Sequence, residues 1–222
     1  MVASGGAALR YPEVVDGMGD RLRHRGPDGR AVLADRCAVL GTERLRIVDL
    51  RERADQPFSS PDGAVWLQAN GEIYNSPEIR RRYADFPFRS GSDVEAILPL
   101  YLEHGTGAVE MLDGMFGLAI RDHRDHSLIL ARDRAGEKPL FYARIGGEIV
   151  FASELQSLFA HPEISRELDQ VAIAEYLRLG YIPEPRTPFL VARRVPAGTF
   201  LRFREDGSQE TVRYWDPTAF EI

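Results

Sequence analysis

Apolar residues recur at helical spacing in five stretches of this chain. In the first stretch, Val14, Val15, Met18 and Leu22 lie three or four residues apart and Pro12 suits the first turn, so a helix is predicted. In another, Ser92 is followed three residues later by Glu95, which is a capping-box pattern. The predicted helices cover residues 12–23, 76–83, 92–104, 153–159 and 170–179.

Other stretches are short, apolar and bounded by turn residues, which is typical of strands. Single strands are predicted at residues 31–40, 45–50 and 64–69, and hairpins at 115–122 with 127–132, 140–143 with 149–152, and 199–204 with 210–214. Residues 182–188 contain three prolines and cannot be regular structure. Antiparallel hairpins mixed with helices indicate an α+β fold in which sheets pack between helical layers.

Composition narrows the function classes. The 222 residues are 44% hydrophobic and 28% charged, as in ordinary globular proteins of one large or two small domains. A net charge of −6 argues against nucleic-acid partners, and no apolar run approaches the length of a membrane span. The single cysteine, Cys37, excludes an internal disulfide and a cysteine-based zinc site, and it fits a reducing cytoplasm. No metal site is expected.

Four polar segments are candidates for chemistry: residues 24–28 (HRGPD), 44–49 (RLRIVD), 70–75 (NGEIYN) and 90–95 (SGSDVE). Taken singly, each is better explained as an ordinary loop at a strand or helix end, because Asn-Gly is a common turn and aspartate favours a helix start. Taken together, they have a common chemical interpretation.

An α-amino acid ligand needs a cation for its carboxylate and an anion for its ammonium group. Arg44 offers a planar fork suited to a carboxylate, and Glu72 and Asp93 offer negative charge. Amide hydrolysis also needs donors directed at the developing oxyanion. The Asn70 side chain and the Gly71 backbone N–H are candidates, because glycine permits close backbone approach.

These segments, with GMFGLAI at 114–120 and LARDRAGEKPLFY at 130–142, occur in an order that resembles the class II glutamine amidotransferases, most closely the asparagine synthetase branch. The resemblance covers nearly the whole chain. It implies the N-terminal-nucleophile hydrolase fold, a four-layer αββα sandwich of two antiparallel sheets. It also implies L-glutamine as the substrate.

The resemblance assigns roles to individual residues. Arg44 would bind the glutamine carboxylate, within a glutamine-binding segment that continues through Leu45, Arg46, Ile47 and Val48. Asn70 and Gly71 would form the oxyanion hole, while Glu72 and Asp93 would hold the α-amino group. Arg44 is therefore expected to lie opposite Asp93 in one cleft.

The chain departs from this family at its start. Members begin with a cysteine in a Cys-Gly-Ile-x-Gly strand, whose thiolate attacks the amide while its own α-amino group serves as the base. Here the sequence begins Met1-Val2-Ala3-Ser4, and Ser4 would lack that base. We expect a late start rather than a lost nucleophile, with residues 2–4 at the site end of one sheet. Cys37 lies in an apolar run and is expected to be a buried structural residue.

The expected function is the glutamine-hydrolysing domain of an asparagine synthetase-like enzyme, truncated at both ends and inactive as numbered. Residues 1–160 would form the amidotransferase core, and 161–222 the rest of that domain, leading toward an absent synthetase domain. ATP and Mg belong to that synthetase domain, a partner in cis or trans, and no cofactor is expected in this chain. A homodimer is a further possibility. The alternative is a catalytically dead scaffold or partner-binding domain, as in β-lactam synthetase-like proteins.

Overall fold

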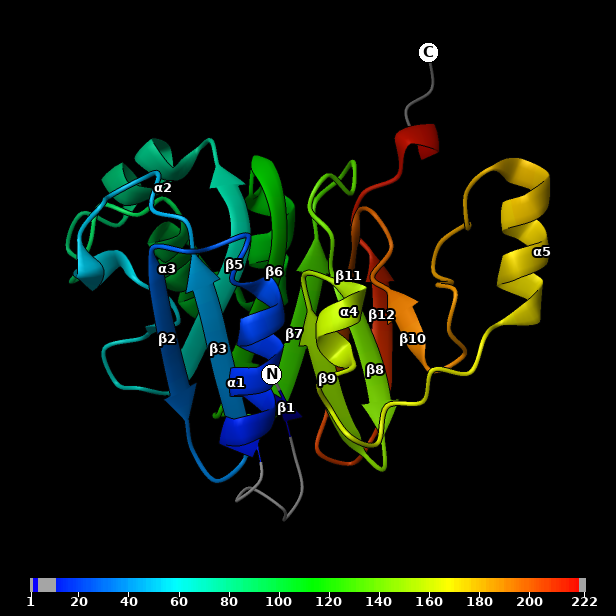
Figure 1. Cartoon of the computed structure of the whole chain (residues 1–222). Coiled ribbons are helices and arrows are strands. Elements are labelled where there is room, and N and C mark those ends of the chain that lie inside the picture. The colour runs from blue at the N-terminus through cyan, green and yellow to red at the C-terminus, as the bar shows by residue number, and fades with distance from the viewer. Residues whose placement is uncertain (1, 4–10, 220–222) are drawn as a thin grey trace.

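The computed structural model describes residues 2–3 and 11–219 of the chain (Figure 1). Its α-helices are α1 (Tyr11–Leu22), α2 (Ser76–Arg82), α3 (Ile97–His104), α4 (Leu155–Leu158) and α5 (Gln170–Leu179). Its 3-10 helices are η1 (Glu52–Ala54), η2 (Val94–Ala96), η3 (Gly105–Met111) and η4 (Pro217–Ala219).

The strands of the described residues form two sheets, and all neighbouring strands within them pair antiparallel. Sheet A has the order β10 (Ala192–Arg194), β8 (Phe141–Ile145), β9 (Glu148–Ala152), β1 (Val2–Ala3), β3 (Ala38–Arg44) and β2 (Gly29–Ala34). Sheet B has the order β12 (Gln209–Arg213), β11 (Thr199–Phe203), β7 (Ser127–Arg132), β6 (Gly114–Asp122), β5 (Val65–Ile73) and β4 (Phe58–Ser59).

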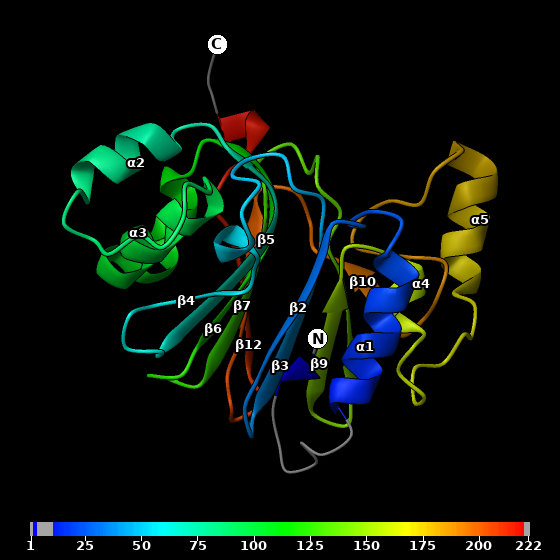
Figure 2. The ribbon, with the colours of Figure 1, turned by 60° about the vertical axis from the view of Figure 1, so that its left-hand side comes forward.

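Alternation along β3 shows how the layers are built. Leu40 joins a core cluster with Trp66 of sheet B, whereas Val39 joins a cluster with Val15 of α1. A third cluster packs sheet B against α3 through residues such as Leu98. Helices α1 and α4 therefore cover the outer face of sheet A, and α2 and α3 that of sheet B (Figures 1 and 2). The predicted αββα sandwich is confirmed.

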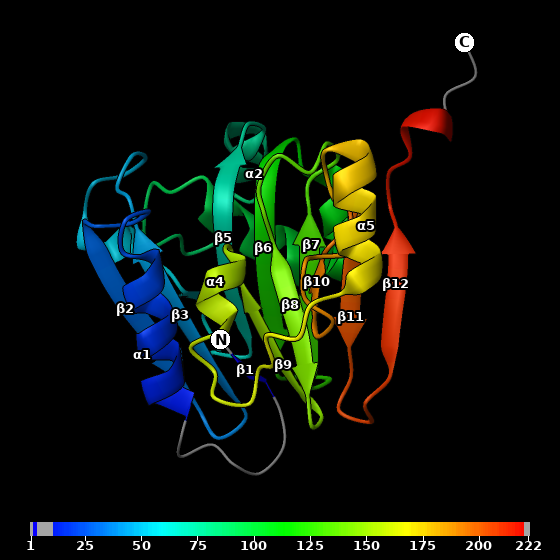
Figure 3. The same cartoon turned by 45° about the vertical axis from the view of Figure 1, so that its right-hand side comes forward.

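The described residues from 161 to 219 complete both sheets, because β10 extends sheet A while β11 and β12 extend sheet B. Helix α5 stands beside the sandwich rather than within it (Figures 1 and 3). Within the described residues, no helix has both the length and the apolar character that crossing a membrane requires.

Two strand predictions are wrong. Residues 31–40 are not one strand but parts of β2 and β3, joined by a turn in which the Asp35 carboxylate accepts the N–H groups of Cys37 and Ala38, both at 2.7 Å. Residues 45–50 form an open loop, because the Arg44 side chain captures backbone carbonyls that a strand would direct to its neighbours.

Two further expectations are corrected. Val2 and Ala3 do not lie at the site end of sheet A, because they pair with Val39 and Ala38, at the end of β3 remote from Arg44. Ser4 lies outside the described residues. The predicted helix 92–104 is divided into η2 and α3, since the Glu95 carboxylate turns to the preceding loop instead of capping at Ser92.

Candidate active site

A cavity of about 570 Å³ is lined by residues of both sheets and of the loops that follow β3 and precede η2. The sequence-predicted residues that line it are Arg44, Leu45, Ile47, Val48, Asn70, Gly71, Glu72 and Asp93. Arg46 is not among the lining residues, because its guanidinium is directed at Asp55, with Nη2 at 2.7 Å from Oδ2. The structure thus brings together segments that are separated by up to about fifty residues.

Arg44 organises the loop beyond β3. Its Nη2 donates to the carbonyl oxygens of Val48 at 2.9 Å and Asp49 at 2.8 Å, and its Nη1 donates to Asp55 Oδ1 at 2.5 Å. The side chain is buried, with 8% of the residue exposed. With the Arg51 carbonyl, which Nη1 also contacts at 3.4 Å, the guanidinium has four protein acceptors, and these hold the loop in one shape and keep the charge at the cavity wall.

Asp55 is shared by two arginines. Burial alone would raise the pKa of Asp55, but hydrogen bonds from Arg46 and Arg44 outweigh it, so the pKa lies below the usual range. Taken by themselves, Arg44, Arg46 and Asp55 carry one net positive charge at this end of the cavity. An anionic group is therefore favoured there.

Asp49 joins the loop after β3 to the loop before η2. Its Oδ2 accepts the Gly91 N–H at 2.6 Å, and Arg51 forms a forked pair with both carboxylate oxygens. The pKa of Asp49 is held far below its usual range, first by the hydrogen bonds from Arg51 and then by the Gly91 N–H. Its backbone has φ 53°, a left-handed conformation that aspartate tolerates better than most residues.

One edge of β5 opens on the cavity beyond its short pairing with β4. There side chains take the place of a neighbouring strand. The Gln56 side chain accepts the Ala69 N–H at 2.6 Å and donates to the Ala69 carbonyl. Asp93 Oδ2 accepts the Ile73 N–H at 2.7 Å. Backbone N–H groups two residues apart point to the same side of a strand. The Gly71 N–H, midway between Ala69 and Ile73, therefore points to this open edge.

Asn70 and Gly71 are suited to oxyanion binding in different ways. Among the described residues, the buried Asn70 Nδ2 has no hydrogen-bond partner, which is uncommon for a buried donor. At Gly71, a Cβ would lie 2.0 Å from the Met115 oxygen and 2.7 Å from Phe116 Cα, so this position admits no side chain without separating β5 from β6. The pair offers one side-chain donor and one backbone donor at the cavity.

Asp93 is carried by a loop that buried polar groups fix. Glu95, 1% exposed, accepts the N–H groups of Arg89 at 2.7 Å and Ser90 at 2.8 Å, and the Ser90 hydroxyl at 2.6 Å. Arg80 holds the Ser92 carbonyl at 2.5 Å. Asp93 uses Oδ2 for Ile73, and Glu72 also lines the cavity, so two carboxylates lie at the end that would take an ammonium group.

Sequence reasoning placed Asp49 in the candidate segment 44–49 without assigning it a role, and it did not identify Asp55 or Gln56 as parts of the site. Their partners lie on neighbouring loops and strands, so no local periodicity marks them. Across the described residues, no group of three or more His, Cys, Asp or Glu side chains could hold a metal ion.

Cys37 is exposed, so its prediction as a buried residue is wrong. It lies just before β3, whereas Arg44 is the last residue of that strand. Seven residues of extended chain span about 24 Å, so the Cys37 thiol is remote from Arg44 and from the site residues gathered at that end of β3. It is excluded as the nucleophile.

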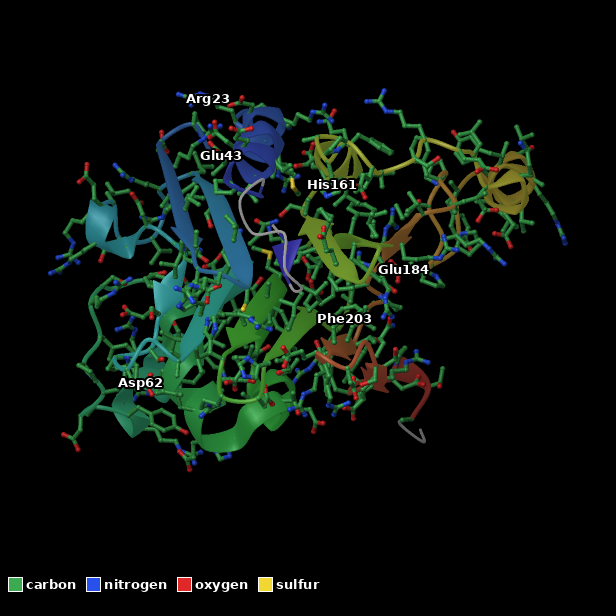
Figure 4. The ribbon with its side chains drawn as sticks, turned by 90° about the horizontal axis from the view of Figure 1, so that it is seen from below. Arg23, Glu43, Asp62, His161, Glu184 and Phe203 are labelled. Atoms are coloured by element: carbon green, nitrogen blue, oxygen red, sulfur yellow. The ribbon has the colours of Figure 1, made fainter. Side chains whose placement is uncertain are left out.

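The cavity also extends between β3 and β9, where it is lined by residues 41–44 and 151–153. These residues come directly after Val39 and Val150, which pair with Val2 from either side. On β3, Arg44 lies on the same face as Leu40, toward sheet B, whereas Glu43 lies on the α1 side (Figure 4). An extended segment continuing β1 from Val2 would thus enter the cavity between these two strands.

Comparison with known proteins identifies the architecture and the family. The family model described as "Glutamine amidotransferase domain" matches residues 4–215. Asparagine synthetase [glutamine-hydrolyzing] 2 of Bacillus subtilis is 35% identical over 208 residues, which are 91% of this chain and 28% of the relative. Asparagine synthetase [glutamine-hydrolyzing] 1 of the same organism is 36% identical over 198 residues, covering 88% of the chain and 31% of the relative. The chain thus spans less than a third of the length of these relatives.

Among solved structures, glutamine phosphoribosylpyrophosphate amidotransferase from B. subtilis superposes with a TM-score of 0.64 at 19% identity, covering 92% of this chain and 47% of that chain. At this identity the similarity shows the fold alone. It agrees with the antiparallel sandwich described above.

Proposed function

Because the chain belongs to the glutamine amidotransferase domain family, we propose that it is the glutamine-binding and glutamine-hydrolysing domain of an asparagine synthetase-like enzyme. The observation that carries the proposal is the convergence of Arg44, Asn70, Gly71, Glu72 and Asp93 on one cavity. The net positive end at Arg44 matches the substrate carboxylate, and Glu72 and Asp93 match the ammonium group. Between them, Asn70 and Gly71 supply the two donors that amide hydrolysis requires.

We assign the reaction steps accordingly. The loop held by Arg44 binds the α-carboxylate, and Asp93 fixes the α-ammonium while its own position is held by Ile73. When a thiolate attacks the side-chain amide, negative charge develops on the amide oxygen. Asn70 Nδ2 and the Gly71 N–H then stabilise this charge, the C–N bond breaks, and ammonia leaves with a proton returned by the base. Water hydrolyses the remaining thioester, which releases glutamate and restores the thiol.

A polypeptide that begins at Met1 should bind glutamine without hydrolysing it. Val2 has no nucleophilic side chain, and Cys37 lies about 24 Å from Arg44 by strand length. We propose that hydrolysis depends on a cysteine-bearing strand placed before Val2. The pairing register of β1 supports one particular length for such a strand.

Each residue added before Val2 advances the pairing by one residue along β3, starting from Val39. The fifth added residue therefore faces Arg44. Paired residues of neighbouring strands direct their side chains to the same face, so this side chain would point toward sheet B, Asn70 and Gly71. A fourth residue would face Glu43 and point toward α1.

The register argument defines the test. Replacing Met1 by Cys-Gly-Ile-Ala-Gly, with the initiator methionine removed, should give glutamate release from glutamine. The control Ser-Gly-Ile-Ala-Gly should bind glutamine with little turnover. The shortened extension Cys-Ile-Ala-Gly places its cysteine opposite Glu43 and should be inactive although it folds. If the five-residue cysteine extension stays at background in a folded chain that binds glutamine, the catalytically dead scaffold is favoured instead.

Two further points about the partner and the location are also proposals. The synthetase portion named in the relatives is the proposed recipient of the ammonia, whether in cis or in trans. A cytoplasmic location stays a prediction that depends on the single, exposed cysteine.

A further inference from the structure

Helix α5 has an unusual environment for its composition. Seven of its ten residues are Val, Ala, Ile, Tyr or Leu, yet Ala172 is the one residue of this fully described helix that is buried. Leu177 is 80% exposed, Val171 54% and Tyr176 52%, and Tyr181 just beyond the helix is 61% exposed. A helix that is apolar on most sides is normally buried within a protein or an interface.

Local contacts hold α5 in its shape without covering it. Asp169 caps the first turn by accepting the N–H groups of Val171 and Ala172, both at 3.1 Å, and Gly180 ends the helix with φ 79°. Arg186 pairs with Glu175 at 3.0 Å. A helix of ten residues is marginal in water on its own. The exposed side chains thus form a preformed, rigid surface, which we call the α5 surface (Val171, Tyr176, Leu177, Leu179 and Tyr181).

The α5 surface does not have the chemistry of a membrane anchor. Interfacial helices carry several lysines or arginines on the face opposite the apolar one. In α5 the charged residues are Glu175 and Arg178, and Glu175 is already paired. Exposed apolar side chains with so few charges among them are typical of a permanent protein interface, which is more apolar than a transient one.

We propose that the α5 surface is the docking site for the synthetase portion of the enzyme. The inference rests on the proposed function, because its partner is the polypeptide that the relatives carry outside the region matched here. This chain accounts for 28% and 31% of the two B. subtilis relatives described above, so more than two thirds of each lies outside the matched region.

The position of α5 supports this choice of partner. Helix α5 and η4, which ends at Ala219, both lie toward the upper end of the molecule in Figures 1 and 3. The strand ends that carry Arg44 and Ile73 also point to that end (Figure 1). A large partner that covers α5 would therefore also lie on the side of the molecule where the cavity residues emerge.

Thiol accessibility tests the docking directly. In a Cys37→Ser background, Leu177→Cys introduces one thiol on the α5 surface, where the native residue is 80% exposed, and the unsubstituted chain supplies the exposed Cys37 as a control thiol just before β3, at the end of that strand opposite Arg44. Each is placed in the chain alone and in a chimera in which the chain replaces the matched third of B. subtilis asparagine synthetase 2. The rate of maleimide labelling is measured. Covalent linkage makes the docking intramolecular, so a weak interface is still occupied.

We expect labelling at position 177 to be at least tenfold slower in the chimera than in the chain alone, and labelling at Cys37 to change less than twofold. Equal rates at position 177 would overturn the docking proposal. A labelling rate at position 177 that falls as the concentration of the chain alone rises would also overturn it, because a second copy of the chain would then cover the α5 surface. Glutamine binding by the same proteins is measured in parallel. Loss of that binding would contradict the proposed function, whereas unprotected position 177 with intact glutamine binding contradicts only the docking.

Discussion

Asn70 and Asn75 are the same residue type, five positions apart, and the structure gives them opposite roles. Among the described residues, Asn70 Nδ2 is buried without a hydrogen-bond partner. Asn75 is fully used, since Nδ2 donates to the Met111 carbonyl at 2.9 Å and Oδ1 accepts the Asp113 N–H at 3.0 Å. Alanine at position 70 should therefore affect catalysis without affecting stability, and alanine at position 75 should do the reverse.

The magnitudes follow from these contacts. Among the described residues Asn70→Ala breaks no side-chain hydrogen bond, so the melting temperature should stay within about 2 °C, while loss of one oxyanion donor lowers kcat by roughly 100- to 1,000-fold. Asn75→Ala removes two partly solvated bonds, which cost about 1–2 kcal/mol. In a domain of this size that lowers the melting temperature by roughly 2–8 °C.

The assay uses the chain extended by Cys-Gly-Ile-Ala-Gly, with glutamate release giving kcat and KM, and calorimetry giving the melting temperature. Asn70→Ala should lower kcat with KM little changed, because an oxyanion donor acts in the transition state. The reasoning is refuted if Asn70→Ala retains kcat within twofold. It is equally refuted if Asn75→Ala loses as much activity as Asn70→Ala.

Three further predictions concern binding, pH and the thiol. Asp93→Asn keeps an oxygen for the Ile73 N–H but removes the negative charge, so calorimetry should show glutamine binding at least tenfold weaker. Binding of glutaramate, which lacks the α-amino group, should be unchanged. An equal loss of affinity for both ligands would contradict the ammonium role of Asp93. The depressed pKa of Asp49 means that its stabilisation is complete above the ordinary carboxyl value of 3.8 and is lost as pH falls below it. Denaturant unfolding should thus show stability falling more steeply below about pH 4 in the native chain than in Asp49→Asn, and identical slopes would exclude this contribution. Cys37 should react with a maleimide in the folded chain without weakening glutamine binding, and a thiol that labels only after unfolding would contradict its exposure.

The fold was predictable where signals are local. Helix α5 begins and ends as the pattern predicts, because its limits are set by neighbouring residues, Asp169 as the cap and Gly180 as the left-handed end. The turn at Asp35 is local too, and its aspartate-centred hydrogen bonds are the signal that could have divided residues 31–40 into two strands. The apolar character of that run outweighed the single aspartate in the prediction.

The loop after β3 could not be predicted in the same way. Its sequence alternates apolar and polar residues, as a strand does, but the Arg44 side chain binds the carbonyls of Val48 and Asp49 and removes them from any ladder. The fold of the loop depends also on Asp55 and on Gly91, which approach from elsewhere in the chain. Such capture by side chains depends on tertiary contacts, which periodicity does not record.

The charges of the site, by contrast, could be predicted from the sequence. Selectivity for an amino acid depends on the summed charge at the carboxylate end of the site and at the ammonium end, and residue types determine these sums. Arg44 and Arg46 share Asp55, so one positive charge remains at the carboxylate end, and the protein has already satisfied most of the Arg44 donors. A carboxylate bound there gains mainly from the residual charge and from the shaped loop, rather than from a free guanidinium fork. Removing Asp55 would raise the charge but release the arginines, so the carboxylate would meet a stronger and less ordered cation. For this reason the geometry held by Asp55, rather than the presence of Arg44 alone, determines whether this end of the cavity recognises glutamine.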